Sequence, residues 1–343
     1  MFTGRVRQSR NVRSDHRKHG RAHRSQTLAE LLEPRRLLSQ SALITRANIP
    51  GLSDQDSLTT QALAIDANGN LFGATKSSIL EIPSGAGAPI VLASFDPTVT
   101  GPPAPGVVLD SHGNLFGLAG VGQNVPETIY ELPAGSHVIV QRLAFSTNDV
   151  VLYSGLTADP SGDLFYLGRD QSNSPSLLKL PAGSHTPVSM SVPLDTAVMA
   201  SDAAGDLFTL RSTFSGQSLA TDIIEISTAT GTTQTLATIV GPGTDAPHGP
   251  LLCDDQGNLY GTISSTISTL GEIFELPAGG HEVMTLASGG LPGGINGGLA
   301  RDAEGDLFGT VGDFATDGPR IVELPAGGTD FVTLVGSDVK FAD

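Results

Sequence analysis

The phrase LAIDANGNLF at residues 63–72 decides the fold of this chain. In it, an apolar stretch leads into an aspartate, two variable positions, a glycine, an Asn or Asp, a leucine and an aromatic residue. The phrase returns five times, as VVLDSHGNLF (107–116), LTADPSGDLF (156–165), MASDAAGDLF (199–208), LLCDDQGNLY (251–260) and LARDAEGDLF (299–308). Because a sequence repeat determines the architecture of a whole chain, it is the first feature to interpret.

The aspartates of the six phrases mark units of similar length, separated by 44, 49, 43, 52 and 48 residues. Periods of about 40 to 50 residues are typical of four-stranded propeller blades. Within the phrase we predict a turn, in which the aspartate accepts backbone N–H bonds and the glycine takes a positive φ. The turn residues are Asp66, Asp110, Asp159, Asp202, Asp254 and Asp302, with Gly69, Gly113, Gly162, Gly205, Gly257 and Gly305.

A second phrase follows later in each unit, where a β-rich run ends in a Pro, Ala and Gly turn signal. Its copies are ILEIPSG (79–85), IYELPAG (129–135), LLKLPAG (177–183), IIEISTATG (223–231), IFELPAG (273–279) and IVELPAG (321–327). A further apolar run comes after each turn. Each unit therefore predicts four antiparallel strands, and the chain predicts an all-β, six-bladed β-propeller with units near 60–100, 101–150, 151–195, 196–245, 246–292 and 293–343.

The sequence does not determine how the ring closes. Residues 42–46 can be drawn as a strand that closes the last blade, and residues 339–342 can join the N-terminal region in a seventh blade. We divide the chain into a tail at 1–40 and a propeller at 41–343.

Charge is divided unevenly along the chain. Residues 1–40 hold ten Lys/Arg against three Asp/Glu, a net of +7, whereas the whole chain carries −16, so the residues after 40 carry −23. An acidic body of this size repels nucleic acids and anionic lipid surfaces. We therefore expect no nucleic-acid partner. No apolar run of about 18 residues occurs, so we expect no transmembrane segment.

The tail contains SQTLAELLEPRRLLSQSALI at residues 25–44. Thr27 and Glu30 fit a capping box, and the leucines that follow Thr27 share a helical face until Pro34. Residues 34–36 (Pro-Arg-Arg) interrupt the apolar stretch, unlike the core of an ordinary secretory signal. The segment LEPRRLLS at 32–39 resembles the LEPR-XLL segment at the N-terminus of many planctomycete proteins. That resemblance implies export to the periplasm, cell surface or exterior. The alternative is a short amphipathic helix packed on the propeller.

The body also resembles a family. Residues 257–280 and 298–328 resemble the GloVer-type tandem repeat, whose hallmark is Gly-Asn-Leu-Tyr-Gly-Thr-Thr, a glycine-rich loop and a Val-Phe-Glu-Leu strand. The similarity to NHL repeats is looser. Units three and four depart from the pattern at Tyr166 and Thr209, where the other units have glycine. The resemblance implies a propeller and surface display, and it implies no defined reaction.

Three features of the sequence are typical of reactive or metal-binding sites. Cys253 is the single cysteine, and we expect a buried structural thiol at this position. The second phrase is followed by a histidine in three units, at His137, His185 and His281. These three belong to different blades, so we expect separate, solvated turn histidines rather than zinc ligands. Residues 66–70 have calcium-like spacing of oxygens but lack the final bidentate acid, which favours a plain turn over a calcium site.

Charged residues that do not repeat are the remaining candidates for a ligand site. Arg169 and Asp170 follow the second strand of unit three and Arg211 that of unit four, so an anionic or sugar ligand could bind there. Arg301 is a fourth candidate. Unrelated surface charges are the competing interpretation.

No Ser/His/Asp or paired-carboxylate arrangement can be placed in this sequence. The favoured function is an exported or cell-surface, non-catalytic, monomeric propeller that binds a protein or glycan partner through its loops, with no cofactor. The alternatives are a metal-dependent lactonase or lyase of the propeller type, or a purely structural envelope component.

Overall fold

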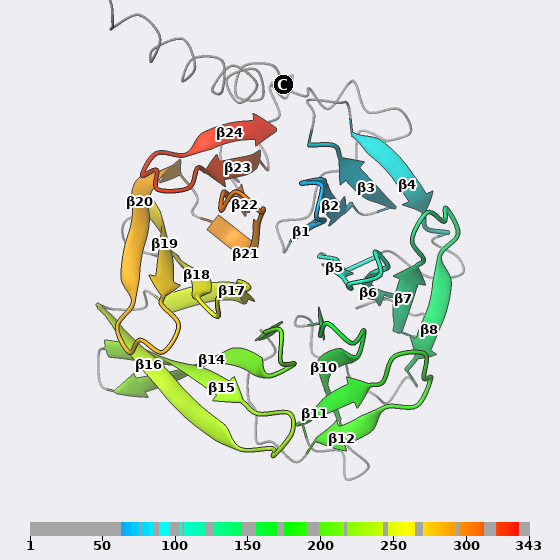
Figure 1. Ribbon diagram of the computed structural model, residues 1–343, viewed down its shortest axis with the longest axis horizontal. Helices are drawn as coiled ribbons and strands as arrows, with labels where there is room; N and C mark the ends of the chain where they lie inside the picture. Colours follow the sequence, from blue (N-terminus) through cyan, green and yellow to red (C-terminus); the bar gives the residue numbers. More distant parts are fainter. Residues whose placement is uncertain are drawn as a thin grey trace, which may run out of the picture.

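The computed structural model describes residues 63–335, apart from 76, 85–88, 97–102, 105, 121–126, 146–155, 170–174, 191–198, 216–217, 243–245, 265–269, 293–294 and 312–319. The described residues form strands β1 to β24 and no helix, so none of them forms a helix long and apolar enough to span a membrane. The strands make six four-stranded sheets around a central axis (Figure 1). This arrangement confirms the predicted six-bladed β-propeller.

Each blade consists of four strands that are consecutive in the sequence. Blade 1 has β1 (Ala64–Ile65), β2 (Leu71–Ala74), β3 (Ser78–Ile82) and β4 (Ile90–Ser94). Blade 2 has β5 (Val108–Leu109), β6 (Leu115–Ala119), β7 (Thr128–Leu132) and β8 (Val140–Ala144). Blade 3 has β9 (Thr157–Ala158), β10 (Leu164–Arg169), β11 (Pro175–Leu180) and β12 (Val188–Met190).

The longest strands belong to blades 4 and 5. Blade 4 has β13 (Met199–Ser201), β14 (Leu207–Ser215), β15 (Ser218–Ile226) and β16 (Thr233–Pro242). Blade 5 has β17 (Ala246–Cys253), β18 (Leu259–Ser264), β19 (Leu270–Leu276) and β20 (Met284–Pro292). Blade 6 has β21 (Ile295–Arg301), β22 (Leu307–Val311), β23 (Arg320–Leu324) and β24 (Val332–Val335).

The first strand of each blade lies nearest the axis and the fourth lies at the rim (Figure 1). Because neighbouring strands are antiparallel, the connections between strands 1 and 2 and between strands 3 and 4 emerge at the same end of a blade. We call this end of the ring the turn face. The connections between strands 2 and 3, and those between blades, emerge at the opposite end, which we call the loop face.

The predicted turn forms in all six blades in the same way. In blade 1 the N–H of Asp66 donates to the carbonyl of Asn70 at 3.1 Å, and the N–H of Gly69 donates to the carbonyl of Asp66 at 3.0 Å. Gly69 has a φ of 79°, a conformation that side-chain-bearing residues rarely adopt. This geometry fits a three-residue hairpin in which the last turn residue is left-handed.

The hydrophobic core is divided into six clusters, and each cluster lies between two neighbouring blades. The last one closes the ring, because Leu63 and Leu71 of blade 1 pack with Ala300, Phe308 and Ile321 of blade 6. Closure therefore takes place between blades 1 and 6 of a six-bladed ring. The tail 1–40 with its LEPR segment, and the proposed closing segments 42–46 and 339–342, lie outside the described residues.

Cross-strand packing explains the departure from the repeat pattern in unit three. Gly117 of β6 pairs with Tyr130 of β7, and a Cβ added to Gly117 would lie 2.3 Å from the Tyr130 hydroxyl oxygen. In blade 3 the equivalent pair is Tyr166 with Leu178, so the large aromatic ring has moved to the other strand. Each pair thus combines one large aromatic side chain with one smaller residue, which suits the close packing of a core.

Candidate functional site

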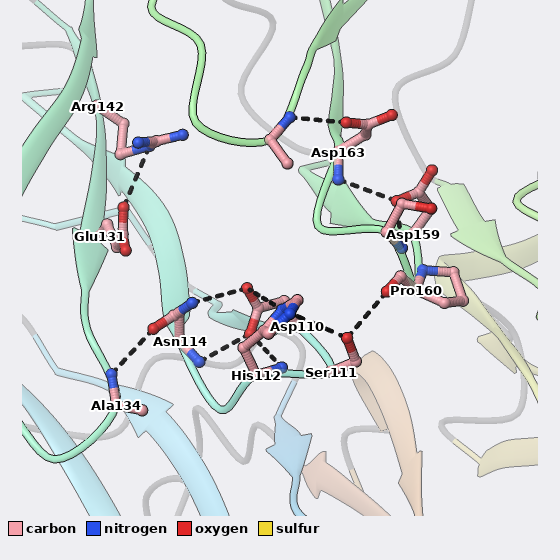
Figure 2. Close-up of polar contacts among 12 residues, drawn as sticks. Asp110, Ser111, His112, Asn114, Glu131, Ala134, Arg142, Asp159, Pro160 and Asp163 are labelled. Carbon is pink, nitrogen blue, oxygen red and sulfur yellow. Dashed lines mark hydrogen bonds and ion pairs between the residues drawn. The ribbon is translucent and has the colours of Figure 1, made fainter.

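Polar side chains of the turn face form a local network around the repeated aspartate, and Figure 2 shows it in blade 2. Backbone N–H groups donate to this aspartate in every blade, whereas an Asn side chain also donates to it in blades 1, 2 and 5 only, because blades 3, 4 and 6 have Asp in place of that Asn. The Oδ1 atom of Asp110 accepts the backbone N–H groups of His112 and Asn114, at 2.9 and 2.8 Å. Its Oδ2 atom accepts the side-chain amide of Asn114 at 2.9 Å. The amide oxygen of Asn114 in turn accepts the N–H of Ala134 at 3.0 Å, which ties the two turns of the blade together. The repeated aspartate therefore has a structural task.

Turns of neighbouring blades also contact each other. The Ser111 hydroxyl of blade 2 donates to the Pro160 carbonyl of blade 3 at 2.9 Å (Figure 2). A Cβ on Gly162 would lie 3.6 Å from the Oδ2 atom of Asp110, and one on Gly205 would lie 3.4 Å from Oδ2 of Asp159. Turn glycines in blades 3 and 4 thus sit beside the carboxylate of the preceding blade.

A position in the third strand is acidic in five blades and basic in blade 3. The five acids are Glu81, Glu131, Glu225, Glu275 and Glu323. Glu131 forms an ion pair with Arg142 at 3.2 Å (Figure 2). The exception, Lys179, pairs with Asp163 and lies 5.4 Å from the centre of the Phe165 ring. Its charge offsets the two aspartates, Asp159 and Asp163, in the turn of that blade.

Arg301, one of the predicted ligand-binding residues, lies at the junction of blades 5 and 6. Its Nη1 atom is 3.9 Å from Oδ2 of Asp254 in blade 5, and its guanidinium lies 5.7 Å from the centre of the Tyr260 ring. The Tyr260 hydroxyl donates to the same Oδ2 atom at 3.1 Å. Since the side chain of Asp254 is only 2% exposed, Arg301 acts as the counter-charge for a buried carboxylate.

The titratable groups near Arg301 have pKa values that are shifted away from neutrality. Burial opposes ionisation of Asp254, but hydrogen bonds from Asn258, Tyr260 and Gln256 outweigh it and lower the pKa of this carboxyl group. Burial, reinforced by the bond to Asp254, raises the pKa of Tyr260 to about 12. Burial and the nearby Asp202 carboxylate raise the pKa of Cys253 to about 12, so the thiol stays protonated. Cys253 is half-buried, whereas the sequence had led us to expect a buried thiol.

Arg211 is held within blade 4. Its Nη2 atom donates to Oδ2 of Asp222 on the neighbouring strand at 2.8 Å, and the Thr238 hydroxyl donates to Oδ1 of the same carboxylate at 2.7 Å. The bond from Arg211 and the bond from Thr238 lower the pKa of Asp222. Asp222 was not predicted from the sequence. Arg211 and Asp222 are the same number of residues away from the short connection at 216–217, and in a hairpin this places them opposite each other.

The four candidate residues come from three blades, and their joint role as a ligand site stays a prediction. Arg169 ends β10 at the register position that Ser212 occupies in β14, whereas Arg211 corresponds to Gly168. Arg301 lies in blade 6, which blade 5 separates from blade 4. Asp170 lies outside the described residues.

The three turn histidines are exposed and lie on three different blades, as expected, but each has a partner. The Nδ1 atom of His137 is 2.7 Å from the carbonyl oxygen of Leu92, that of His185 is 2.7 Å from the carbonyl of Arg142, and that of His281 is 2.8 Å from the carbonyl of Leu236. Each acceptor belongs to the fourth strand of the preceding blade. Among the described residues, no group of three or more His, Cys, Asp or Glu is arranged to hold a metal ion.

No family model and no curated protein matches this chain. Its similarity to solved structures lies in the fold. A putative TolB from Agrobacterium tumefaciens gives a TM-score of 0.50 at 14% identity, with 70% of this chain and 85% of that chain covered. The PQQ-bound aldose sugar dehydrogenase from Streptomyces coelicolor gives 0.51 at 13% identity, with 80% and 96% covered. Oligogalacturonate lyase from Vibrio parahaemolyticus gives 0.50 at 9% identity, with 84% and 80% covered. The chain thus has a β-propeller fold that it shares with enzymes and with a TolB protein.

Proposed function

We propose that this protein is exported and binds a protein or glycan partner through its loop face, without catalysing a reaction. The observation that carries this proposal is the contrast between the two faces of the ring. On the turn face the same hairpin is built six times, and its carboxylates accept hydrogen bonds from the turn itself.

The loop face differs from blade to blade. In blade 4 the strands β14 and β15 have nine residues each, and a connection of two residues, 216–217, joins them. In blade 6 the corresponding strands β22 and β23 have five residues each, and the connection spans 312–319. Connections on a rigid scaffold can vary at little cost in stability, and recognition residues are concentrated in them.

Chemistry of the described side chains supports binding over catalysis. General acids and bases work best when their pKa lies near the working pH. Asp254 has a lowered pKa, whereas Tyr260 and Cys253 each have a pKa of about 12, so all three are shifted away from neutrality. Asp254 and Tyr260 lie at the junction of blades 5 and 6, and Cys253 packs against the core between blades 4 and 5, so we assign these groups a structural role.

Export is the second part of the proposal, and the N-terminal tail supports it. The basic arm and the LEPRRLLS segment precede a strongly acidic body, and the tail resembles a sorting segment of planctomycete proteins. A fluorescent fusion of the full chain and one lacking residues 1–40 would be followed in a planctomycete host. We expect only the full chain to leave the cytoplasm, and equal localisation of the two would contradict export.

Binding would be tested with the purified full chain on two arrays, one of bacterial and plant polysaccharides and one of purified envelope proteins. The same polysaccharides would be assayed for release of new chain ends. We expect retention on one array without cleavage. Cleavage would favour the lyase alternative, and no retention on either array would contradict the binding function.

A further inference from the structure

The fourth strand of five blades contains a β-bulge at the same place. In blade 1, Ile79 pairs with Ala93 and Leu80 pairs with Val91, so Leu92 is passed over in the register. The same shift passes over one residue in each of four other fourth strands. These residues are Arg142 in blade 2, Leu236 in blade 4, Leu286 in blade 5 and Leu334 in blade 6. A bulge leaves the backbone groups of the extra residue outside the regular ladder.

Three of these bulges are the acceptors of the three turn histidines. His137 contacts the bulged residue Leu92, His185 contacts the bulged Arg142, and His281 contacts the bulged Leu236, always through Nδ1 and the carbonyl oxygen. The histidine comes each time from the next blade. A carbonyl oxygen only accepts, so Nδ1 must carry the proton in each of the three.

Blade 3 supplies the negative case. Its fourth strand, β12, pairs with β11 in regular register through Leu177, Leu178 and Lys179, with no bulge. The turn of the next blade, at 227–232, has no histidine and closes differently, since the N–H of Gly231 donates to the carbonyl of Ser227. Bulge and histidine are therefore absent together at the junction of blades 3 and 4.

We propose that a bulge and the histidine of the next blade form one unit, a latch between adjacent blades. The proposal goes beyond the binding function and does not depend on it. Latches fix the turn-face side of the junctions 1–2, 2–3 and 4–5. At the junction of blades 5 and 6 only half of the latch is present. Leu286 forms the bulge, but the turn of blade 6 has Thr329 at the position of the histidine.

The turn of blade 6 has the backbone needed to present a histidine there. The N–H of Gly328 donates to the Pro325 carbonyl at 2.7 Å, as the N–H of Gly280 does to Pro277 at 2.8 Å in blade 5. Gly327 and Gly279 have the same φ of 68°. Thr329→His would therefore complete a fourth latch and raise the midpoint of urea unfolding.

A matched control separates the latch from a general effect of histidine. Thr232→His places an exposed histidine in the turn that follows the unbulged strand β12. We expect Thr329→His to raise the folding equilibrium constant about fivefold, the value of one net hydrogen bond, and Thr232→His, which also removes the hydroxyl contact between Thr232 and Thr230, to give no gain. Equal effects of the two variants, or no gain at position 329, would overturn the proposal.

Loss of an existing latch gives the reverse test. The side-chain amide nitrogen of asparagine corresponds to Nδ1 of histidine, whereas that of glutamine lies further out, towards Nε2. His281→Asn should keep the unfolding midpoint, and His281→Gln and His281→Ala should lower it. In the wild-type chain, ¹⁵N NMR at pH 8 should show the proton on Nδ1 of His137, His185 and His281. A proton on Nε2 in these three rings, or equal loss in the Asn and Gln variants, would contradict the latch.

Discussion

The Nδ1 atom of His137 in blade 2 lies 2.7 Å from the carbonyl oxygen of Leu92 in blade 1. This bond joins a turn to the bulge of the preceding blade, so a backbone carbonyl of one repeat finds its hydrogen-bond donor in the next repeat. The hydrophobic clusters between blades follow the same rule. Stability of the ring is therefore a sum of contacts between nearest neighbours, as in other repeat architectures.

Two buried tyrosines should respond differently to loss of their hydroxyl groups. The Tyr130 hydroxyl is fully buried and has no hydrogen-bond partner among the described residues, and burial raises its pKa far above the usual value. The Tyr260 hydroxyl donates to Asp254. Tyr130→Phe should leave stability unchanged or raise it by up to about 1 kcal/mol, and Tyr260→Phe should lower it by about 1.5–3 kcal/mol. Urea unfolding of both variants checks this, and a loss at Tyr130 as large as at Tyr260 would contradict the assignment.

Glycine in the second strand should be required most strictly where the third strand carries an aromatic ring. A Cβ on Gly261 would lie 2.4 Å from the Phe274 ring, so Gly261→Ala should cost about 1–3 kcal/mol from overpacking. In blade 1 the partner of Gly73 is Leu80 instead. Adding Phe274→Leu to Gly261→Ala should recover part of the loss, which a double-mutant cycle would measure. Additive effects of the two changes would contradict the clash.

A third prediction concerns the paired aspartates of blade 6. Burial raises the pKa of Asp302, and the carboxylates of Asp306 and Glu304 add to the effect. A raised folded-state pKa favours the protonated form, so the contribution of Asp302 to stability is present at acid pH and lost as the pH rises through that pKa. Asp306→Asn would provide the amide that Asn114 provides in blade 2.

The Asp306→Asn variant should gain about 0.5–1 kcal/mol at pH 7, a low value because solvent screens a half-buried pair. The gain should fade at pH 3, because the parent Asp302 carboxyl group, with its raised pKa, is then more protonated than at pH 7. The reverse change, Asn258→Asp in blade 5, should destabilise at pH 7. Unfolding midpoints measured at both pH values check the prediction, and a gain that does not change with pH would contradict it.

The fold followed from the sequence because the repeat encodes each blade locally. Residues 66–69 specify a hairpin by themselves, since the backbone hydrogen bonds made by Asp66 and Gly69 close the turn within five residues. Contacts between blades were harder to predict. Arg301 was proposed as a ligand-binding residue because its charge does not repeat between units, and its contact with Asp254, which comes from the preceding blade, was not predicted.

The turn histidines show the same limit. Exposure and separation were predicted correctly for His137, but its bond to Leu92 was not. The bond depends on a bulge, and a bulge adds one residue to a strand without changing its apolar character. In the sequence, this bond corresponds to two features that occur together, which are a histidine in the turn after the third strand and a longer fourth strand in the preceding unit.

Binding by the loop face is the central claim, and one comparison tests it most directly. Ala119 pairs with Thr128 and Val311 pairs with Arg320, as Ser215 pairs with Ser218 across the connection 216–217. Residues 120–127 and 312–319 can therefore each be replaced by Gly-Gln, the pair found at 216–217. The control is Glu282→Ala, an exposed residue of the turn face.

The dissociation constant for the partner retained on the array would be measured for all four chains. We predict that at least one of the two loop replacements raises it tenfold or more, equivalent to about 1.4 kcal/mol, and that Glu282→Ala leaves it unchanged. Unchanged binding in both loop replacements together with weakened binding in Glu282→Ala would place recognition on the turn face and contradict the account.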